Sequence, residues 1–280
     1  MFAATASFVA MQAVVKAARL GGMDTTEVMF FRTAPGLPVL WLSLRKKGHG
    51  LAPEDGAGVL IRSLLGTLAM GTNFAALVWL TLAQFSTLSL AQPIFVALAA
   101  PLVLREPTRR HVILAMPLAI AGALTLILPG IESRSMPPIA AALAIASALF
   151  SAFAQMWVRK TTASDPPDRV VFYFALVVSV LSLVIGLVRG RFHTLTAEST
   201  GVALLEIVGM AGFGTLGQAL MTRAYFHGEA ASVSMVAYSG VALSLLLDIV
   251  LWSAIPTAMT LIGALLMVVA GLVLLRGERV

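Results

Sequence analysis

Four ionisable side chains interrupt long apolar stretches of this sequence, and they are the first residues whose chemistry calls for an explanation. They are Lys16, Arg32, Glu206 and Asp248. A charged side chain within the hydrocarbon of a membrane is energetically costly, so such a residue is taken to be functional by default. Two are positive and two are negative, and we hypothesise that they pair into a charge network that stabilises one conformational state. The alternative is that each side chain reaches the membrane interface separately.

Uncharged polar residues recur in the same stretches at the spacing of a helical face. Ser86, Ser89 and Gln92 follow one another at three-residue intervals, and such spacings place side chains on one side of a helix. A bundle that turns these faces away from lipid acquires a polar interior, as an aqueous pathway requires. The competing account is hydrogen bonding between helices, at less than about 2 kcal/mol each. The residues that we expect to contact a bound molecule are Gln12, Asn73, Trp79, Gln92, Gln155 and Tyr238.

The composition indicates the environment in which these residues must be placed. Of the 280 residues, 59% are hydrophobic and only 11% are charged. Soluble domains have about 25% charged and about 45–50% apolar residues, so this chain has too little polar surface to cover an exterior facing water. It is therefore predicted to be an integral membrane protein. Because it contains no cysteine, disulfides, thiol chemistry and metal sites with cysteine ligands are excluded.

The apolar stretches are long enough to be membrane-spanning helices, which need about 20 residues each. Runs such as LVVSVLSLVIGLV (176–188) do not alternate in polarity as the strands of a membrane barrel would. In the first stretch the basic residues follow the apolar run, which is the reverse of the order in a signal peptide. We predict an all-α integral membrane protein with ten transmembrane helices, at about 2–19, 25–44, 58–80, 84–104, 110–128, 137–157, 170–188, 200–221, 230–252 and 257–275.

The distribution of Lys and Arg predicts how these helices are oriented. If the N-terminus is cytoplasmic, the inner loops and the C-terminal tail hold twelve of the 19 basic residues and the outer loops hold four. Both termini are therefore expected in the cytoplasm, and the four buried ionisable residues fall in the outer half of the membrane. Topology also accounts for the net charge of +6, which would otherwise invite a nucleic-acid interpretation.

Two segments indicate that one unit is built twice. PTRRHVILAMPLAIAG (107–122) and PTAMTLIGALLMVVAG (256–271) both open with Pro-Thr and close with Ala-Gly. The first begins the fifth predicted helix and the second begins the tenth, so each unit holds five helices, namely 1–130 and 131–280. Because five is odd, the second unit enters the membrane from the opposite face, which is an inverted repeat. The alternative is that these letters are common punctuation of membrane helices.

Several short motifs occur in the order typical of one family. They are F-x-A-L (74–77), QPIFV (92–96), LREP (104–107) and YSGVALSLLLD (238–248). With them, nearly the whole chain resembles an EamA-type protein of the drug/metabolite transporter superfamily. The resemblance implies a central cavity lined by predicted helices 1, 3, 4, 6, 8 and 9. One departure is that Glu106 has Ile255 as its counterpart in the second half.

The resemblance implies a secondary transporter that moves a small polar metabolite, such as an amino acid or a nucleoside, across the cytoplasmic (inner) membrane by alternating access. In this reading Lys16, Arg32, Glu206 and Asp248 are gating or coupling charges. The partners are the substrate and the lipid bilayer; coupling to protons and a homodimeric state are left open, and no nucleic acid is expected. No catalytic motif, metal site or cofactor site is recognised, so an enzyme is not expected. The alternative function is a non-transporting accessory subunit of a lipid-modifying or export complex.

Overall fold

The chain is described here from a computed structural model, which defines residues 1–103, 117–118, 120–125, 127–128, 136–192, 200–227, 233, 236 and 239–276. Throughout these residues the regular secondary structure is helical, which confirms the predicted all-α class. The helices are α1 (Phe2–Leu20), α2 (Thr25–Thr33), η1 (Ala34–Gly36), α3 (Leu37–Lys46), α4 (Gly56–Ala76), α5 (Leu82–Ser89), α6 (Ala91–Val103), α8 (Pro138–Thr161), α9 (Pro167–Val188), α10 (Thr200–His227), α12 (Ser239–Trp252) and α13 (Ala258–Arg276).

The predicted spans correspond to these helices, except for the fifth, at 110–128, of which only 117–118, 120–125 and 127–128 belong to the described residues. Five of the described helices are long and apolar enough to cross a membrane, and two further apolar helices are shorter. The five are Gly56–Ala76, Leu82–Pro101, Pro138–Thr161, Pro167–Val188 and Gly201–His227; the shorter two are Ser239–Trp252 and Ala258–Ala270.

Two predicted spans are each built from more than one helix. The span at 25–44 begins with a capping box, in which Asp24 and Glu27 each accept a backbone amide. It is then interrupted by η1, which contains Pro35, because proline has no N–H to donate to the preceding turn. The span at 84–104 is divided between α5 and α6 at Leu90. Thr81 starts α5 early, through a second capping box with Gln84.

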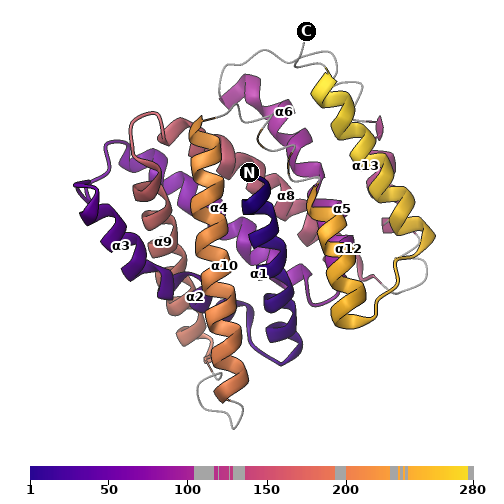
Figure 1. Ribbon diagram of the computed structural model, residues 1–280, viewed down its shortest axis with the longest axis horizontal. Coiled ribbons are helices and arrows are strands. Elements are labelled where there is room, and N and C mark those ends of the chain that lie inside the picture. The colour runs from indigo at the N-terminus through magenta and orange to yellow at the C-terminus, as the bar shows by residue number, and fades with distance from the viewer. Residues whose placement is uncertain are drawn as a thin grey trace.

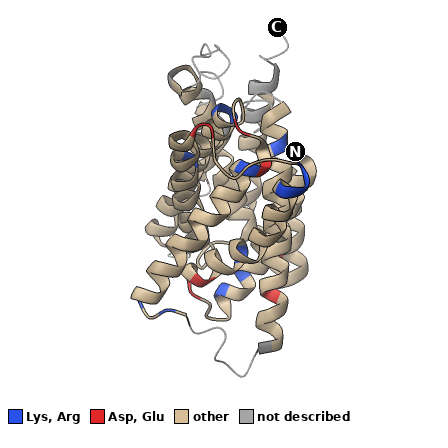
Figure 2. Ribbon diagram, turned by 90° about the vertical axis from the view of Figure 1, so that its left-hand side faces the viewer, with Lys and Arg blue, Asp and Glu red and all other residues tan. Residues whose placement is uncertain are grey.

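The first helix lies in the interior of the bundle, between α10 and α12 (Figure 1). Small residues on α10 let α1 come close: a Cβ at Gly217 would lie 3.1 Å from the ring of Phe8. Gly214 and Gly217 therefore allow close packing, as in other membrane bundles, whereas a Cβ at Gly212 would meet no atom within 4 Å. Charged residues gather toward the two ends of the bundle, and the flanks between them are mostly uncharged (Figure 2). That distribution suits a bundle whose flanks face lipid.

Two helices that are predicted to occupy equivalent places in the two halves touch one another. A Cβ at Gly122 would lie 2.9 Å from the carbonyl oxygen of Gly263 on α13, so only glycine fits at this crossing. The Ala-Gly pair that closes the first repeated segment therefore packs closely on α13 at Gly122. The start of α1 and the end of α13 lie at the same end of the bundle (Figure 1).

The α3–α4 connection is held in place by charged residues at the α8–α9 connection. Asp165 accepts hydrogen bonds from the backbone amides of Glu54 and Asp55, each at 3.0 Å, and from Arg169 at 2.7 Å. Arg169 also donates to the carbonyl of Gly50 at 2.9 Å. Burial alone would raise the pKa of Asp165, but these hydrogen bonds and the charge of Arg169 outweigh it, and the pKa is lowered from its ordinary value.

Candidate functional site

A cavity of about 200 Å³ lies at the centre of the bundle. Its wall includes residues of α1, α4, α5, α6, α8, α10 and α12, which correspond to the six helices that the family resemblance implied. Two more helices contribute, because Arg32 of α2 and Phe174 of α9 also line it. The cavity therefore draws its wall from both predicted halves of the chain.

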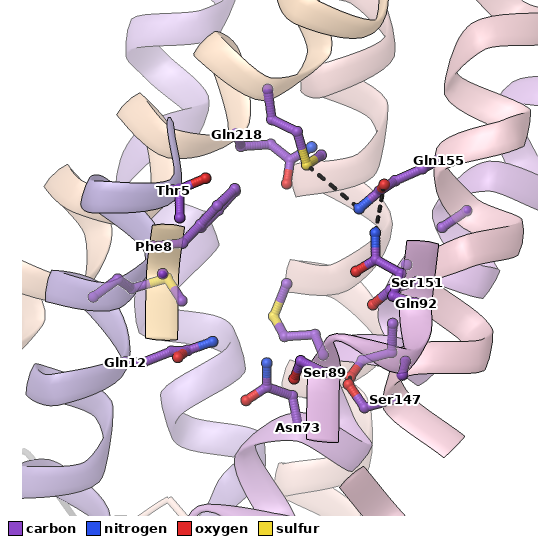
Figure 3. Close-up of a pocket in the computed structure, with 18 of the residues that line it drawn as sticks. Thr5, Phe8, Gln12, Asn73, Ser89, Gln92, Ser147, Ser151, Gln155 and Gln218 are labelled. Carbon is purple, nitrogen blue, oxygen red and sulfur yellow. Dashed lines mark hydrogen bonds between the residues drawn. The ribbon is translucent and has the colours of Figure 1, made fainter. Parts of the chain in front are cut away.

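Amide side chains make up much of the polar wall. Of the predicted contact residues, the structure brings Gln12, Asn73, Gln92 and Gln155 to the cavity. Figure 3 shows Gln12 and Asn73 reaching into the space from α1 and α4. The Oε1 atom of Gln12 and the Oδ1 atom of Asn73 are buried and have no hydrogen-bond partner among the described residues. Since a buried polar atom without a partner is unfavourable, these two amides are available to a bound molecule.

At another part of the wall, the amides bond to one another. Gln92 donates to Oε1 of Gln155 at 2.5 Å, and the hydroxyl of Tyr225 donates to the same oxygen. The amide nitrogen of Gln155 faces the sulfur of Met221 at 3.9 Å (Figure 3). Gln155 of α8 is thus held by residues of α6 and α10, which fixes its orientation toward the cavity.

Two of the predicted contact residues are not found in the described wall. Trp79 follows the end of α4 at Ala76 and is 45% exposed, so it does not line the cavity. The prediction extended this helix to residue 80 and so kept Trp79 on its polar face, whereas the chain has already left the helix there. Tyr238 lies outside the described residues.

Gln218 was not among the contact residues that the sequence analysis expected. Gln218 on α10 lines the cavity and is buried. It is followed at spacings of four and seven by Thr222 and Tyr225, both also buried. This is the same helical spacing that identified the other polar faces, so it could have identified this one.

Two arginines lie in the cavity wall with their side chains almost fully buried. Arg32 is 4% exposed and Arg62 is 2% exposed. Their guanidinium carbons stand over the same ring, that of Phe174, at 5.9 Å and 4.0 Å from its centroid. Arg32 was expected in a network of gating charges; it instead faces the cavity and forms no ion pair with any described residue.

The other expected charges divide into a pair and a single residue. Asp248 is 2% exposed and lies 3.6 Å from Lys16, whose ammonium also stands 4.7 Å from the ring of Trp252. Glu206 is half-buried on α10 and forms no ion pair within the described part of the chain. The structure therefore joins Lys16 with Asp248, but it does not assemble all four charges, because Arg32 and Glu206 point to different surroundings.

Asp248 has a second role that the sequence analysis did not foresee. Its two carboxylate oxygens accept the backbone amides of Leu82 and Ala83, at 3.0 and 2.7 Å. These amides belong to the first turn of α5, where a negative charge is favoured by the helix dipole. Asp248 of α12 therefore caps α5. Close by, Ser86 and Ser244 share a hydrogen bond of 2.6 Å between the same two helices.

The cavity offers hydrogen bonds and positive charge to a bound molecule. Its polar wall consists of amides, serines, a threonine and the two arginines. Within the described ranges, no three His, Asp or Glu side chains converge as metal ligands would. This chemistry is suited to holding a small polar molecule.

Comparison with known proteins relates the whole chain to membrane transporters. The model of the EamA-like transporter family matches residues 1–128 and 138–276. The pseudopaline exporter CntI of Pseudomonas aeruginosa is 31% identical over 276 residues, which cover 99% of this chain and 94% of that protein. An uncharacterized transporter of Helicobacter pylori is 25% identical over 259 residues, or 89% of this chain and 84% of that protein.

A solved structure supports the fold. One crystal structure aligns with a TM-score of 0.71 and covers 100% of this chain and 98% of its own, at 18% sequence identity. At that identity the likeness shows the fold alone.

Proposed function

Because the chain belongs to the EamA-like transporter family, we propose that it is a secondary transporter carrying a small polar metabolite across the cytoplasmic membrane by alternating access. The observation that carries this proposal is the polar cavity, whose wall takes side chains from helices of both predicted halves. A cavity between two halves can open to either face of the membrane when one half moves against the other.

The inverted arrangement of the halves is part of this proposal. The two matched segments, 1–128 and 138–276, meet where the repeat boundary was predicted. The bias of Lys and Arg favours cytoplasmic termini, and an odd number of helices in each half then inverts the second. The contact of Gly122 with α13 is also consistent with a close approach of corresponding helices across the repeat axis.

We propose that the cavity is open at one end and closed at the other. Its wall includes Met1, at the start of α1, and Met221, which belongs to the same hydrophobic cluster as Met1, and this favours access from the cytoplasm. At the opposite end, Asp248 fastens α12 to the start of α5 and pairs with Lys16. In the proposed cycle, this contact is the outer gate and must separate when the cavity opens outward.

The experiment that tests the proposal is flux through the purified protein in liposomes. A panel of amino acids, nucleosides and related metabolites includes pseudopaline, since the similar Pseudomonas protein is an exporter of it. Saturable flux of one compound supports the transporter, whereas silence across the panel favours the accessory subunit.

A matched pair of variants connects that flux to the cavity. Asn73→Leu removes an unpaired amide from the wall at similar volume, and we expect a loss of transport of about 3- to 10-fold, as for one neutral hydrogen bond. Trp79→Phe changes a side chain outside the wall and should leave the flux unchanged. Equal effects of the two substitutions would contradict the assignment of the site.

A further inference from the structure

We propose that the transported molecule is a small organic anion, and that Arg32 and Arg62 together bind its carboxylate or phosphate oxygens. This inference rests on the proposed function, because it names the class of substrate for the same cavity. The supporting observation is a pair of buried guanidinium groups that face one cavity and have no acidic partner in the part of the chain that the structure describes.

The two arginines have few hydrogen-bond partners in the protein. Among the described residues, Arg32 donates only to sulfur atoms, at 3.0 Å to Met11 and 3.9 Å to Met70, and thioether sulfur is a weak acceptor. The Nε and Nη1 atoms of Arg62 are buried with no hydrogen-bond partner among the described residues. Most of the donor capacity of these two side chains therefore remains unused.

Both guanidinium groups lie close enough to act on one ligand. Each is held against the ring of Phe174, so their separation cannot exceed the sum of the two ring distances, 5.9 and 4.0 Å. Glycines make room for them: a Cβ at Gly66 would approach Nη1 of Arg62 to 2.4 Å, and one at Gly214 would approach Nε of Arg32 to 3.0 Å. Glycine at both positions therefore leaves space for both guanidinium groups.

Electrostatics determines what kind of ligand fits. Removing a charged group from water costs several kcal/mol, on the order estimated for buried ions, unless an opposite charge compensates it. Two such cations facing one cavity also repel one another. An anion relieves both costs, and the planar guanidinium group matches the paired oxygens of carboxylate and phosphate.

Within the described residues, the aspartates that form ion pairs do so with cations other than Arg32 and Arg62. Asp248 is engaged by Lys16 and by the start of α5, and Asp168 is paired with Lys47. Asp165 accepts Arg169 and two backbone amides. These carboxylates hold the ends of the bundle together, which leaves the arginines of the cavity for an external anion.

The other residues of the cavity wall indicate which further groups the ligand carries. The unpaired amide oxygens of Gln12 and Asn73 accept hydrogen bonds, so they favour a ligand that also carries amino, ammonium or hydroxyl groups. With about 200 Å³ of space, the cavity limits the ligand to a small metabolite. The inferred substrate is therefore an anion with additional hydrogen-bond donors, rather than a lipid or an apolar drug.

Binding to the purified protein tests the inference without requiring transport. The probes are succinate, inorganic phosphate and the neutral analogue succinamide, titrated at constant ionic strength while the thermal unfolding temperature is measured. We expect at least one anion to raise this temperature in a dose-dependent manner and succinamide to leave it unchanged. Comparing the rise in unfolding temperature with succinate and with phosphate distinguishes a carboxylate substrate from a phosphorylated one.

Variants assign the binding to the two arginines. Arg62→Gln and Arg32→Gln should each weaken the anion response at least 10-fold, as expected for a charge-assisted hydrogen bond worth about 1.5–3 kcal/mol. Arg62→Lys should keep part of the response, because it retains the charge. The control is Arg45→Gln, which makes the same change in charge at an exposed position.

The results with the anions and the variants either support or overturn the inferred anion site. If neither anion stabilises the wild type more than succinamide, or if the glutamine variants of Arg32 and Arg62 respond like the wild type, the inference is overturned. Should Arg62→Gln fail to fold, Arg32→Gln and Arg62→Lys still provide the comparison. Anion binding without flux in liposomes would contradict the transporter but retain the anion site, whereas flux of a neutral metabolite unaffected by Arg62→Gln would contradict only the anion site.

Discussion

At the scale of single residues, Asp248 connects more of the structure than any other charge that the sequence analysis singled out. It pairs with Lys16 from α1 and caps α5 from α12, so one carboxylate joins three helices. Both side chains are buried, so solvent does not compete for these contacts. Breaking a buried pair leaves an uncompensated charge, which is more costly than losing an exposed ion pair.

We predict that Asp248→Asn lowers the free energy of unfolding by about 1–3 kcal/mol, since the asparagine keeps the shape but not the charge. The measurement is thermal unfolding in detergent, in which each kcal/mol corresponds to about 2–4 °C for a chain of roughly this size. Glu206→Gln is the control and should have little effect, because Glu206 forms no ion pair with any described residue.

A second variant separates the pair from the helix cap. Lys16→Met combined with Asp248→Asn removes the cation that the single change leaves uncompensated, so the double variant should lose less than the sum of the two single losses. Strict additivity would show that Lys16 and Asp248 do not stabilise one another.

The sequence identified which residues matter at this scale better than it identified their partners. Charge within an apolar stretch was sufficient to select Lys16, Arg32 and Asp248. Their partners depend on how each helix is rotated about its axis and on where the neighbouring helices end. Neither can be read from the sequence before the helices are packed together. The backbone amides of α5, which complete the site of Asp248, cannot be recognised from any residue type.

At the scale of elements, hydrophobic stretches located the helices, but the ends of helices depended on caps and prolines. The capping box of Thr81 and Gln84 separates α5 from α4, and the chain has left α4 before Trp79 is reached. The break at η1 follows from Pro35, and a proline that interrupts a helix can be recognised in the sequence. Boundaries set by side-chain caps were therefore the less predictable ones, and the wrong placement of Trp79 is a direct result.

The docking of the α3–α4 connection gives a prediction that depends on pH. Asp165 has a lowered pKa in the folded protein, so its contribution to stability is fully present above its ordinary pKa of 3.8 and is lost as the pH falls through the lower folded value. Asp165→Asn should therefore destabilise the protein most at about pH 7, and by progressively less as the pH falls below 3.8.

Thermal unfolding of the wild type and Asp165→Asn across this range is the measurement. Hydrogen exchange of the amides of Glu54 and Asp55 provides a local readout, because Asp165 accepts both of them. A difference in unfolding temperature that stays constant with pH would contradict a role for the ionised carboxylate.

At the scale of the whole molecule, the account is based on two proposed halves whose helices together line a polar cavity. The number of helices in each predicted unit was sufficient to propose inversion, and helical spacing was sufficient to propose a polar centre. The pair of arginines at that centre was not predicted, because Arg32 and Arg62 are far apart in sequence and meet only over the ring of Phe174.

The chain is convenient for testing access to this cavity, since it contains no cysteine. Ser151 lines the cavity on α8 and is not among the residues assigned to ligand binding. A single substitution, Ser151→Cys, therefore introduces one reactive thiol into the wall in an otherwise unreactive background.

The most direct test of the central claim is the reactivity of Ser151→Cys toward a membrane-impermeant thiol reagent, applied from each side of oriented vesicles. The account predicts modification from both sides, faster from the cytoplasmic side in the absence of substrate, with the outer rate rising during turnover. Modification from one side only, under every condition including turnover, would contradict alternating access through this cavity.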